Sequence, residues 1–356
     1  MKILVGLSGG VDSAVAAYLL SKQGHTVTGV TMSIWDKNSP LKAAHRDACF
    51  SPAEDQDIAE AKNICAKLGV RHEVVDCTQA YKQVVLENFK RDYLSGRTPN
   101  PCVWCNGQIK FRVLPDSAKA AGIDFDLFAT GHYANVVRFE QTGRFALKKA
   151  ADPKKDQTYF IYRLTQEQLA SVVFPLGGMT KEQVRQTARD IGLPVSDKPD
   201  SQDFYAGHYG DLLDATDKDG VFIDVDGRVL GRHKGFWHYT VGQRKGLGIA
   251  AKRPLYVLRL NAERNEVVLA EREAVLTRDA VAENCVWGAI DGLTEERRVT
   301  AKLRSTQTPA PAVVFPLSDE RVGVRFDESQ KPAAPGQSVV FYDGDIVLGG
   351  GVLTLK

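Results

Sequence analysis

The sequence lacks the features that mark a membrane protein or a broadly basic nucleic-acid-binding protein. No apolar run approaches the roughly 18 residues that a membrane-spanning helix needs, and Met1 to Leu7 shows no basic leader. Lys and Arg total 46 against 44 Asp and Glu, a formal net charge of +2. Any nucleic acid must therefore be bound by local basic patches. These absences predict a cytoplasmic protein that does not bind membranes.

Cysteine is also scarce, and its spacing is more informative than its number. Six cysteines occur in 356 residues, and without a secretory leader they indicate a reducing compartment. There, closely spaced cysteines more often bind a metal or take part in catalysis than form a disulfide framework. Cys102 and Cys105 form a CxxC pair. A zinc half-site is the alternative for this pair, although no second CxxC or histidine pair follows.

The order of β-rich and helical stretches predicts an α/β fold. Through about Pro194 these stretches alternate, which is typical of a doubly wound, mostly parallel sheet with helices on both faces. The expected strands are residues 2–7, 26–32, 71–76 and 126–129, and the expected helices are residues 13–22, 55–68, 80–94 and 107–121. Short alternating runs then predict a small central domain and a C-terminal β-barrel. We expect the three domains to span 1–202, 203–280 and 281–356.

A glycine-rich loop follows the first predicted strand and opens the first predicted helix. It reads Gly6-Leu7-Ser8-Gly9-Gly10-Val11-Asp12-Ser13, and backbone N–H groups converge on anions at such places. It lacks the Lys of a GxxxxGK[ST] loop, which argues against ordinary γ-phosphate transfer. Asp12 is a candidate ligand of Mg²⁺ on a pyrophosphate; the alternative is a strand–helix turn with polar caps. The pattern resembles the pyrophosphatase-loop enzymes, which cleave ATP between the α and β phosphates and adenylate a carbonyl oxygen.

The cysteine pair lies in a segment that contains residues unfavourable to regular structure. Gly96, Pro99 and Pro101 predict an exposed loop up to Asn106. Cys105 would then stand just before a helix, whose N-terminal dipole lowers a thiol pKa and so favours the nucleophilic thiolate. A thiol nucleophile combined with an adenylating loop indicates sulfur transfer.

Six motifs in order resemble one family over residues 4 to 351. They are SGGVDS, GRTPNPCxxCNxxIKF from Gly96 to Phe111, ATGHY at 129–133, KDQTYF at 155–160, TVGQRKGLGI at 240–249 and PGQSVVFYDGDIVLGGG at 335–351. Together they are similar to the tRNA-specific 2-thiouridylases, the family called MnmA or TrmU. The resemblance implies that ATP adenylates the C2 oxygen of the wobble uridine of tRNA, and that sulfur then replaces this oxygen.

The resemblance also assigns roles to individual residues of this chain. ATP would bind to Gly6, Leu7, Ser8, Gly9, Gly10, Val11, Asp12, Ser13, Met32 and Gly131. Asn100, Pro101 and Cys102 would contact the target base, Cys105 would be the catalytic cysteine, and Lys155, Asp156, Gln157, Arg304 and Ser305 would contact tRNA. For Met32, a core position at the end of a strand is an equal alternative.

The chain departs from the family at the second catalytic cysteine. Many members have that cysteine after a D-S-x-x-x segment, where this chain reads Asp200-Ser201-Gln202-Asp203-Phe204 and then Tyr205. Tyrosine cannot carry a persulfide or exchange a disulfide. Either Cys102 and Cys105 work as a redox pair, or Cys49, Cys102 and Cys105 hold a [4Fe-4S] cluster that presents sulfur. An incidental loop thiol is the alternative for Cys49, whereas Cys285 is typical of a core residue.

A basic segment gives the best candidate for contact with RNA. Residues 228–253 contain seven Lys or Arg and no acid, interleaved with Phe236, Trp237 and Tyr239. We expect Arg244 and Lys245 to bind phosphates and the aromatics to stack on bases; a solvated basic face with core aromatics is the alternative. The expected partners are tRNA and either a sulfur-donor protein or inorganic sulfide, with ATP and Mg²⁺, and the chain is expected to be a monomer. Rival functions are an ATP-dependent amidoligase and a non-enzymatic RNA-binding module.

Overall fold

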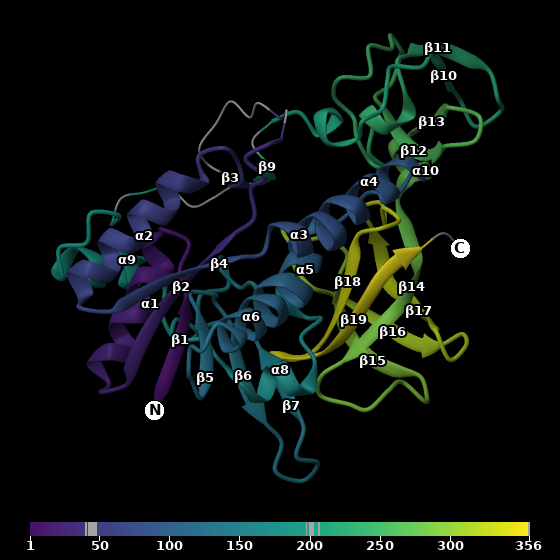
Figure 1. The fold of residues 1–356 in the computed structure, drawn as a ribbon. Coiled ribbons are helices and arrows are strands. Elements are labelled where there is room, and N and C mark those ends of the chain that lie inside the picture. Colours follow the sequence, from purple (N-terminus) through teal and green to yellow (C-terminus); the bar gives the residue numbers. More distant parts are fainter. Residues whose placement is uncertain (40, 42–47, 197, 199–202, 206, 355–356) are drawn as a thin grey trace.

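The computed structural model describes residues 1–39, 41, 48–196, 198, 203–205 and 207–354. Three regions follow one another along the chain: an N-terminal α/β domain, a small central β domain and a C-terminal barrel (Figure 1). The prediction of an α/β fold with a parallel sheet, a central domain and a terminal barrel is confirmed. No helix of the described residues is long and apolar enough to cross a membrane.

A five-stranded parallel sheet organises the N-terminal domain. Its order is β4-β2-β1-β5-β8, with parallel registers throughout. The strands are β1 Lys2–Gly6, β2 Thr26–Ser33, β4 Arg71–Asp76, β5 Leu127–Thr130 and β8 Val172–Val173. The chain leaves β1 toward β2 on one side and later returns to β5 on the other. The crevice at the carboxyl ends of β1 and β5 is thus the point where open α/β sheets bind ligands.

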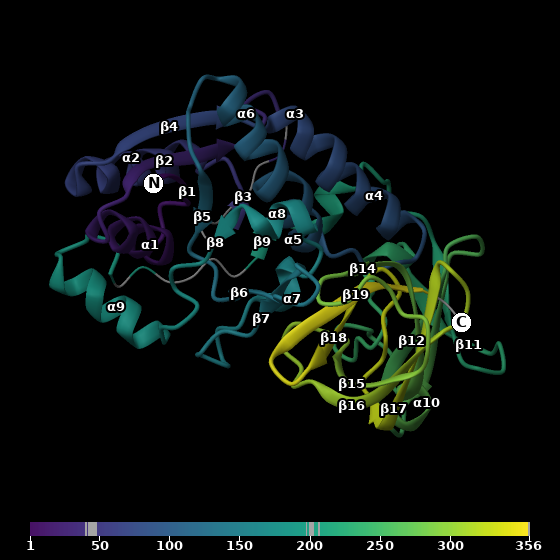
Figure 2. The ribbon, with the colours of Figure 1, turned by 90° about the horizontal axis from the view of Figure 1, so that it is seen from below.

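Helices cover both faces of this sheet because the side chains of β1 alternate. Ile3 and Val5 pack with residues of α1 and α2, whereas Leu4 packs with residues of α6. Figure 2 shows α1 and α9 side by side below the sheet. The helices are α1 Val11–Lys22, α2 Glu54–Leu68, α3 Thr78–Tyr81, α4 Glu87–Leu94, α5 Pro101–Trp104, α6 Leu114–Ala120, α7 Thr158–Ile161, α8 Gln166–Ala170 and α9 Lys181–Asp190. Two π-helical stretches, Lys82–Leu86 and Cys105–Val113, join α3 to α4 and α5 to α6.

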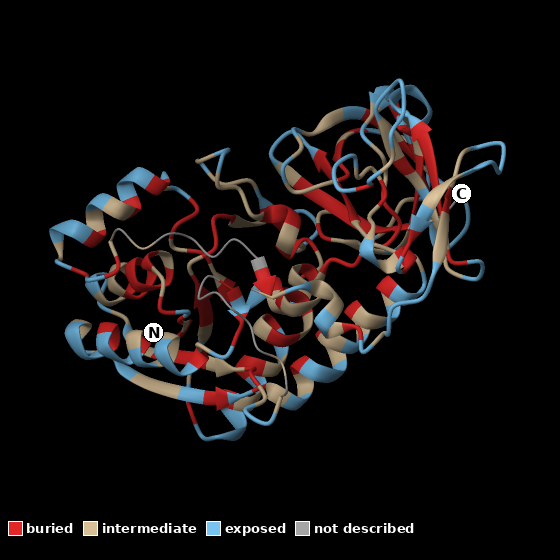
Figure 3. Cartoon of the chain, turned by 90° about the horizontal axis from the view of Figure 1, so that it is seen from above, coloured by how far each residue is buried: buried red, intermediate tan, exposed pale blue. Residues whose placement is uncertain are grey.

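The C-terminal region is a closed six-stranded barrel. Its order is β14-β17-β16-β15-β18-β19, and β19 pairs with β14 to close it. The strands are β14 Thr277–Trp287, β15 Arg297–Lys302, β16 Ala310–Pro316, β17 Arg321–Gln330, β18 Ser338–Asp343 and β19 Ile346–Thr354. Inward-facing side chains such as Val324, Phe326 and Phe341 are fully buried, and buried residues recur along its strands (Figure 3). The hairpin β6 Asn135–Arg138 and β7 Phe145–Lys148 extends this sheet from the N-terminal domain through the pair Ile346 and Lys148.

The central region is a small sheet with its own core. Its order is β11-β10-β13-β12, formed by β10 Gly220–Ile223, β11 Val229–His233, β12 Leu255–Asn261 and β13 Glu266–Glu271. Short helical turns at Tyr209–Leu212, Phe236–His238 and α10 Arg272–Val275 flank it. Phe222, Val257 and Leu269 form the centre of the core. A separate two-stranded pair, β3 Ala48–Phe50 and β9 Asp203–Tyr205, lies beside the N-terminal sheet.

Candidate active site

The phosphate loop is ordered by its own hydrogen bonds and by close packing. Gly9 has a φ of +70°, which glycine adopts without strain, and a Cβ there would lie 2.8 Å from the carbonyl oxygen of Asp57. The Ser13 hydroxyl donates to the carbonyl of Gly10 at 3.2 Å, and it accepts from the Ser8 amide at 3.3 Å. The loop therefore stands preformed at the N-terminus of α1, where the helix dipole favours an anion.

The segment after β5 closes on this loop, as the predicted nucleotide site requires. A Cβ at Gly131 would lie 2.6 Å from the Asp12 carbonyl carbon and 2.6 Å from the Ser13 nitrogen, so only glycine allows this approach. The structure thus brings Gly131 and the phosphate loop together. Met32 lies in β2, partly buried against the main core, which is the hydrophobic cluster that includes Leu4 of β1 and residues of α6. Its neighbour Thr31 donates its hydroxyl to the carbonyl of Leu7 at 3.0 Å and so ties β2 to the loop.

Lys181 supplies the cation that the loop sequence lacks, and sequence reasoning missed it. Its Nζ lies 2.7 and 2.8 Å from the two carboxylate oxygens of Asp12. The Tyr133 hydroxyl also donates to Asp12, at 2.8 Å. The ion pair is largely buried, with Lys181 only 9% exposed. The attraction within a buried pair offsets the cost of desolvation only where its geometry is good. The capping box of Thr180 and Gln183 marks the start of α9 in the sequence, but nothing in it indicates that this helix faces the loop.

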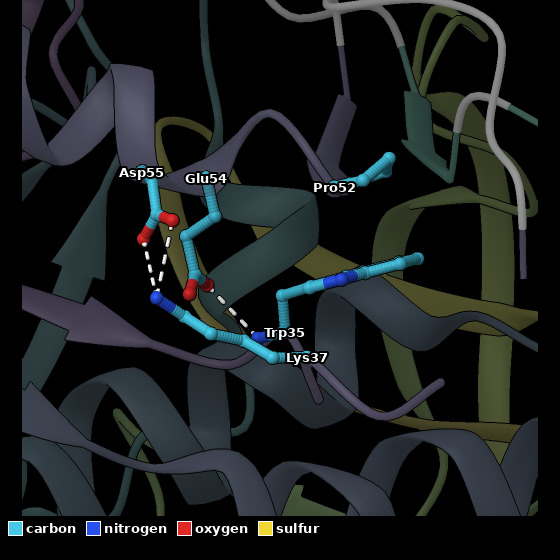
Figure 4. A pocket seen from close by; sticks show the side chains of 5 residues that line it. All are labelled: Trp35, Lys37, Pro52, Glu54 and Asp55. Carbon is cyan, nitrogen blue, oxygen red and sulfur yellow. Dashed lines mark hydrogen bonds and ion pairs between the residues drawn. The ribbon is translucent and has the colours of Figure 1, made fainter. Parts of the chain in front are cut away.

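A shallow polar pocket adjoins the carboxyl end of β2. It is lined by Trp35, Lys37, Pro52, Glu54 and Asp55 (Figure 4). Glu54, the first residue of α2, is 8% exposed. Its carboxylate accepts hydrogen bonds from the Ser33 hydroxyl at 2.6 Å and from the amides of Ile34 at 2.6 Å and Trp35 at 2.9 Å. This carboxylate therefore fixes the chain directly after Met32 and shapes that side of the crevice.

The cysteine segment is helical and partly buried, so the prediction of an exposed loop up to Asn106 is wrong. Pro101 occupies the first position of α5, where its missing N–H has no helical partner to lose. The helix continues without a break into the π-helical stretch that begins at Cys105. Asn100 is 7% exposed, and Cys102 and Cys105 are both partly buried against the main core. Side chains three residues apart share a helix face, so these thiols are neighbours.

The expectation of a lowered pKa for Cys105 is also wrong. Burial raises the pKa of the Cys105 thiol to about 11; Lys110 acts in the opposite direction, and Cys49 raises it further. The residue lies within the helix rather than ahead of its N-terminus, so the dipole does not offset this desolvation. In this conformation the raised pKa favours the neutral form of the Cys105 thiol.

A buried aromatic side chain, Tyr205, occupies the position of the missing second cysteine. Tyr205 is 2% exposed, lies opposite Phe50 in the β3–β9 pair, and its ring centroid is 6.1 Å from that of Phe50. Cys49 precedes Phe50 on the same strand and is exposed. The segment Asp200 to Gln202 lies outside the described residues. Strand β3 therefore carries the exposed Cys49 thiol and pairs with β9, which carries Tyr205.

A preformed metal centre is absent from the described part of the chain. No group of three or more His, Cys, Asp or Glu among those residues is placed to hold a metal ion, so Cys49, Cys102 and Cys105 are not preset as cluster ligands there. Cys65 is 1% exposed, and burial raises the pKa of its thiol to about 11. Cys285 packs against the barrel core, as predicted.

The basic segment of the central domain carries less free charge than its sequence indicates. Lys234 pairs with Asp219 at 2.8 Å and Arg253 pairs with Glu271 at 2.9 Å, because residues outside the segment supply acids. The aromatics Phe236, Trp237 and Tyr239 belong to or pack on the domain core, which favours the alternative of core aromatics. Arg244 and Lys245 are exposed in a loop. The loop also contains Gly242, where a Cβ would lie 3.0 Å from the Arg304 guanidinium.

The other predicted tRNA contacts lie in two places: residues 155–157 beside Tyr133, and residues 304 and 305 in the loop after β15 of the barrel. Gln157 exchanges two hydrogen bonds with the backbone of Tyr133, at 2.8 and 2.9 Å. Asp156 accepts from the Ala150 amide at 3.1 Å and the Thr158 hydroxyl at 2.7 Å, so it is held internally. Lys155 and Ser305 are partly exposed. Arg304 donates to the Pro332 carbonyl at 3.0 Å, and burial lowers the pKa of its guanidinium.

Comparisons with known proteins agree over the whole chain. Three family profiles match in order: "tRNA methyl transferase HUP domain" at residues 1–205, "tRNA methyl transferase PRC-barrel domain" at 213–271 and "Aminomethyltransferase beta-barrel domain" at 277–353. The chain is 50% identical over 356 residues to "tRNA-specific 2-thiouridylase MnmA" of Endomicrobium trichonymphae, covering 99% of both chains. It is 45% identical over 360 residues to the protein of that name from Acetivibrio thermocellus, again covering 99% of both.

Solved structures give a weaker likeness. A 4-thiouridine synthetase–RNA complex with bound ATP is 18% identical, with a TM-score of 0.32 over 60% of this chain and 45% of that one. These values are too low to add to the assignment, which rests on the full-length relatives. Those relatives leave no support for an amidoligase or a non-enzymatic RNA-binding module. The chain belongs to the family of tRNA-specific 2-thiouridylases, the sulfurtransferases that form 2-thiouridine in tRNA.

Proposed function

We propose that this chain binds ATP on the Gly6–Ser13 loop and adenylates the C2 oxygen of the wobble uridine of tRNA. The uridine oxygen attacks the α-phosphate, and pyrophosphate leaves with the electrons of the broken P–O bond. The preformed loop beside Gly131 supports this step, and Lys181, which pairs with Asp12 of the loop, is a cation placed to share the charge of the leaving pyrophosphate. Mg²⁺ would accompany the nucleotide. Asp12 fits as its ligand only once its carboxylate is released from Lys181.

The thiol pair of one helix is proposed to perform the sulfur transfer. The outer sulfur of a persulfide on Cys105 attacks C2, AMP leaves with the original oxygen, and the base is then joined to Cys105 by a disulfide. The thiolate of Cys102 attacks the Cys105 sulfur, which releases 2-thiouridine and leaves a Cys102–Cys105 disulfide. Residues three apart in a helix fall within the Cα separation that a disulfide can bridge. The single observation that carries this proposal is the position of both thiols on one continuous helix, in a chain whose phosphate loop is formed.

Two kinds of sulfur donor can reload this pair. Inorganic sulfide that attacks the Cys102–Cys105 disulfide yields a Cys105 persulfide and a Cys102 thiolate directly, with no further reductant. A donor protein that carries a persulfide requires a dithiol reductant to open the disulfide first. The alternative is an iron–sulfur cluster on Cys49, Cys102 and Cys105. The described residues form no ready ligand group and therefore do not fit a cluster in this conformation.

We also propose that tRNA lies across the Arg244–Lys245 loop, Arg304 and the Lys155–Gln157 segment. The target uridine must leave its stack to reach the crevice, as base-modifying chemistry generally demands. The approach of Gly242 to Arg304 supports one continuous surface that includes the central domain and the barrel. The protein is proposed to act as a monomer in the cytoplasm.

Serine variants of the cysteines test this proposal. Cys105→Ser and Cys102→Ser should each lower 2-thiouridine formation by about 100-fold or more, while tRNA-dependent pyrophosphate release continues. Cys285→Ser is the matched control, since its thiol belongs to the barrel, and it should leave both readouts unchanged. Cys49→Ser separates the routes: the thiol pair predicts a colourless protein and an active variant, whereas a cluster predicts joint loss of iron and thiolation. Full activity of Cys102→Ser would leave only an external sulfur carrier acting with Cys105.

A further inference from the structure

The C-terminal motif that begins at Pro335 binds the backbone of the segment that leads to the cysteines. The Thr98 amide donates to the Pro335 carbonyl at 2.7 Å. The side-chain amide of Gln337 donates to the carbonyls of Thr98 at 3.2 Å and Pro99 at 2.8 Å. These three bonds secure two consecutive residues directly before Asn100 and α5. The barrel therefore contacts the polypeptide at the point where the cysteine helix begins.

The barrel side of this contact is rigid and closely fitted. Gly336 has a φ of +91°, and a Cβ there would lie 2.7 Å from the Thr98 carbonyl oxygen. Its amide donates to the Leu353 carbonyl at 2.8 Å, and the Leu353 amide donates to the Gln337 carbonyl at 2.7 Å. The turn is thus fixed to β19, a strand of the closed barrel. Any side chain at position 336 would force the two segments apart.

The cysteine segment requires an external partner of this kind. Pro99 and Pro101 have no backbone N–H, so this stretch cannot form the regular hydrogen bonds that would hold it in place. Buried carbonyl groups need hydrogen-bond donors, and Pro99 is buried. Gln337 is the side chain that supplies donors to both carbonyls. The barrel therefore contributes to the position of the first turn of the cysteine helix.

We propose that Gln337 is a positioning residue for sulfur transfer. By fixing residues 98 and 99, it sets where the helix of Cys102 and Cys105 begins, so that the barrel forms part of the active site. This inference rests on the proposed role of Cys105. A shift of about 1 Å in a reacting group can cost roughly 100-fold in rate, so a loosened segment should be visible in the chemical step.

The chain offers a matched pair of residues for the test. Gln166 of α8 likewise donates its side-chain amide to two carbonyls, those of Phe145 at 2.8 Å and Gly288 at 3.1 Å, and it also joins the N-terminal domain to the barrel. Gln337→Glu and Gln166→Glu make the same chemical change at two places in one interface. Gln337→Met removes the donor without adding charge, in case the glutamate variant does not fold.

Two readouts separate positioning from general stability. We expect Gln337→Glu to lower single-turnover 2-thiouridine formation by about 10- to 100-fold, and to speed iodoacetamide labelling of Cys105 by about fivefold or more as the segment loosens. Gln166→Glu should do neither at a similar melting temperature. Equal losses in both variants, or unchanged labelling and rate in Gln337→Glu and Gln337→Met, would overturn the proposal. If Cys105→Ser stayed active, the proposed nucleophile would be wrong, yet the labelling comparison would still decide whether Gln337 positions the segment.

Discussion

The phosphate loop and the cysteine segment, the two parts of the proposed active site, are held in different ways. The loop is secured within its own domain by the Ser13 hydroxyl, the left-handed Gly9 and the close approach of Gly131. The cysteine segment depends on the barrel, through Pro335 and Gln337. The loop also contains an ion pair, Asp12 with Lys181, whereas burial raises the pKa of the Cys105 thiol.

This difference indicates that the two halves of the reaction, adenylation and sulfur transfer, start from different states of the site. Adenylation would use a phosphate loop whose backbone is formed before substrates arrive, although Asp12 must exchange Lys181 for Mg²⁺. The proposed sulfur transfer would use the Cys105 thiol, whose pKa is raised to about 11 by burial, in a helix whose preceding residues are bound by the barrel. The following predictions test whether the two halves are separable in this way.

The largest effect is expected at the Asp12–Lys181 pair. Asp12→Asn and Lys181→Met should each reduce tRNA-dependent pyrophosphate release by about 100-fold or more. Lys181 would stabilise the negative charge that develops on the leaving pyrophosphate, and Asp12 would hold the Mg²⁺ that accompanies the nucleotide. Lys2→Met is the matched control: Lys2 also pairs with an aspartate, Asp124, but is exposed at the opposite end of β1. Near-normal pyrophosphate release by Asp12→Asn would mean that the loop does not hold the reacting phosphates.

A smaller change, when taken for each pH unit, is expected in the labelling of Cys105. Burial raises the thiol pKa, so the neutral form is favoured and the thiolate becomes dominant only above about pH 11. Alkylation of Cys105, followed by peptide mass spectrometry, should therefore rise by about tenfold per pH unit from about pH 7 to 10. The exposed Cys49 in the same protein serves as internal reference for the reagent. A rate that levels off below about pH 9 would show that the thiol is already activated and that the two halves do not differ.

The smallest effect is expected on the RNA surface. Arg244→Glu and Lys245→Glu should weaken tRNA binding and lower the slope of log K against log salt by about one unit for each phosphate that is no longer bound. Lys234→Glu is the control, since Asp219 already neutralises that residue, and its slope should change less. Equal slopes for all variants and the parent protein would mean that the Arg244–Lys245 loop is a solvated surface that does not bind phosphates.

Much of the fold is predictable from the sequence because its signals are local. Alternation in the strands, the glycine loop after β1 and the helix pattern to Ala120 follow from short stretches of sequence, and motif resemblance places Gly131 at the loop. The cysteine helix escapes prediction because proline statistics describe loops and helix first turns equally well, and only the structure shows that Pro101 is at the first helical position.

The remaining features depend on contacts that no short window contains. Lys181 meets Asp12 across 169 positions, and the acids that neutralise Lys234 and Arg253 come from outside the basic segment. The raised pKa of Cys105 is a consequence of burial, which is a property of the assembled core. Motifs therefore indicate the function, whereas the electrostatic state of the site follows only from the folded chain.

The contact between Gln337 and the cysteine segment also has a consequence for newly synthesised protein. Its partners are separated by 239 and 238 positions. At about 5–20 residues per second, a ribosome makes Gln337 roughly ten to fifty seconds after Thr98. During that delay Cys102 and Cys105 are joined to a segment that the barrel does not yet hold, and their thiols are open to oxidants. Variants that slow closure of the barrel should therefore show a larger oxidised fraction of Cys102 and Cys105 in nascent chains, even where the mature enzyme has normal activity.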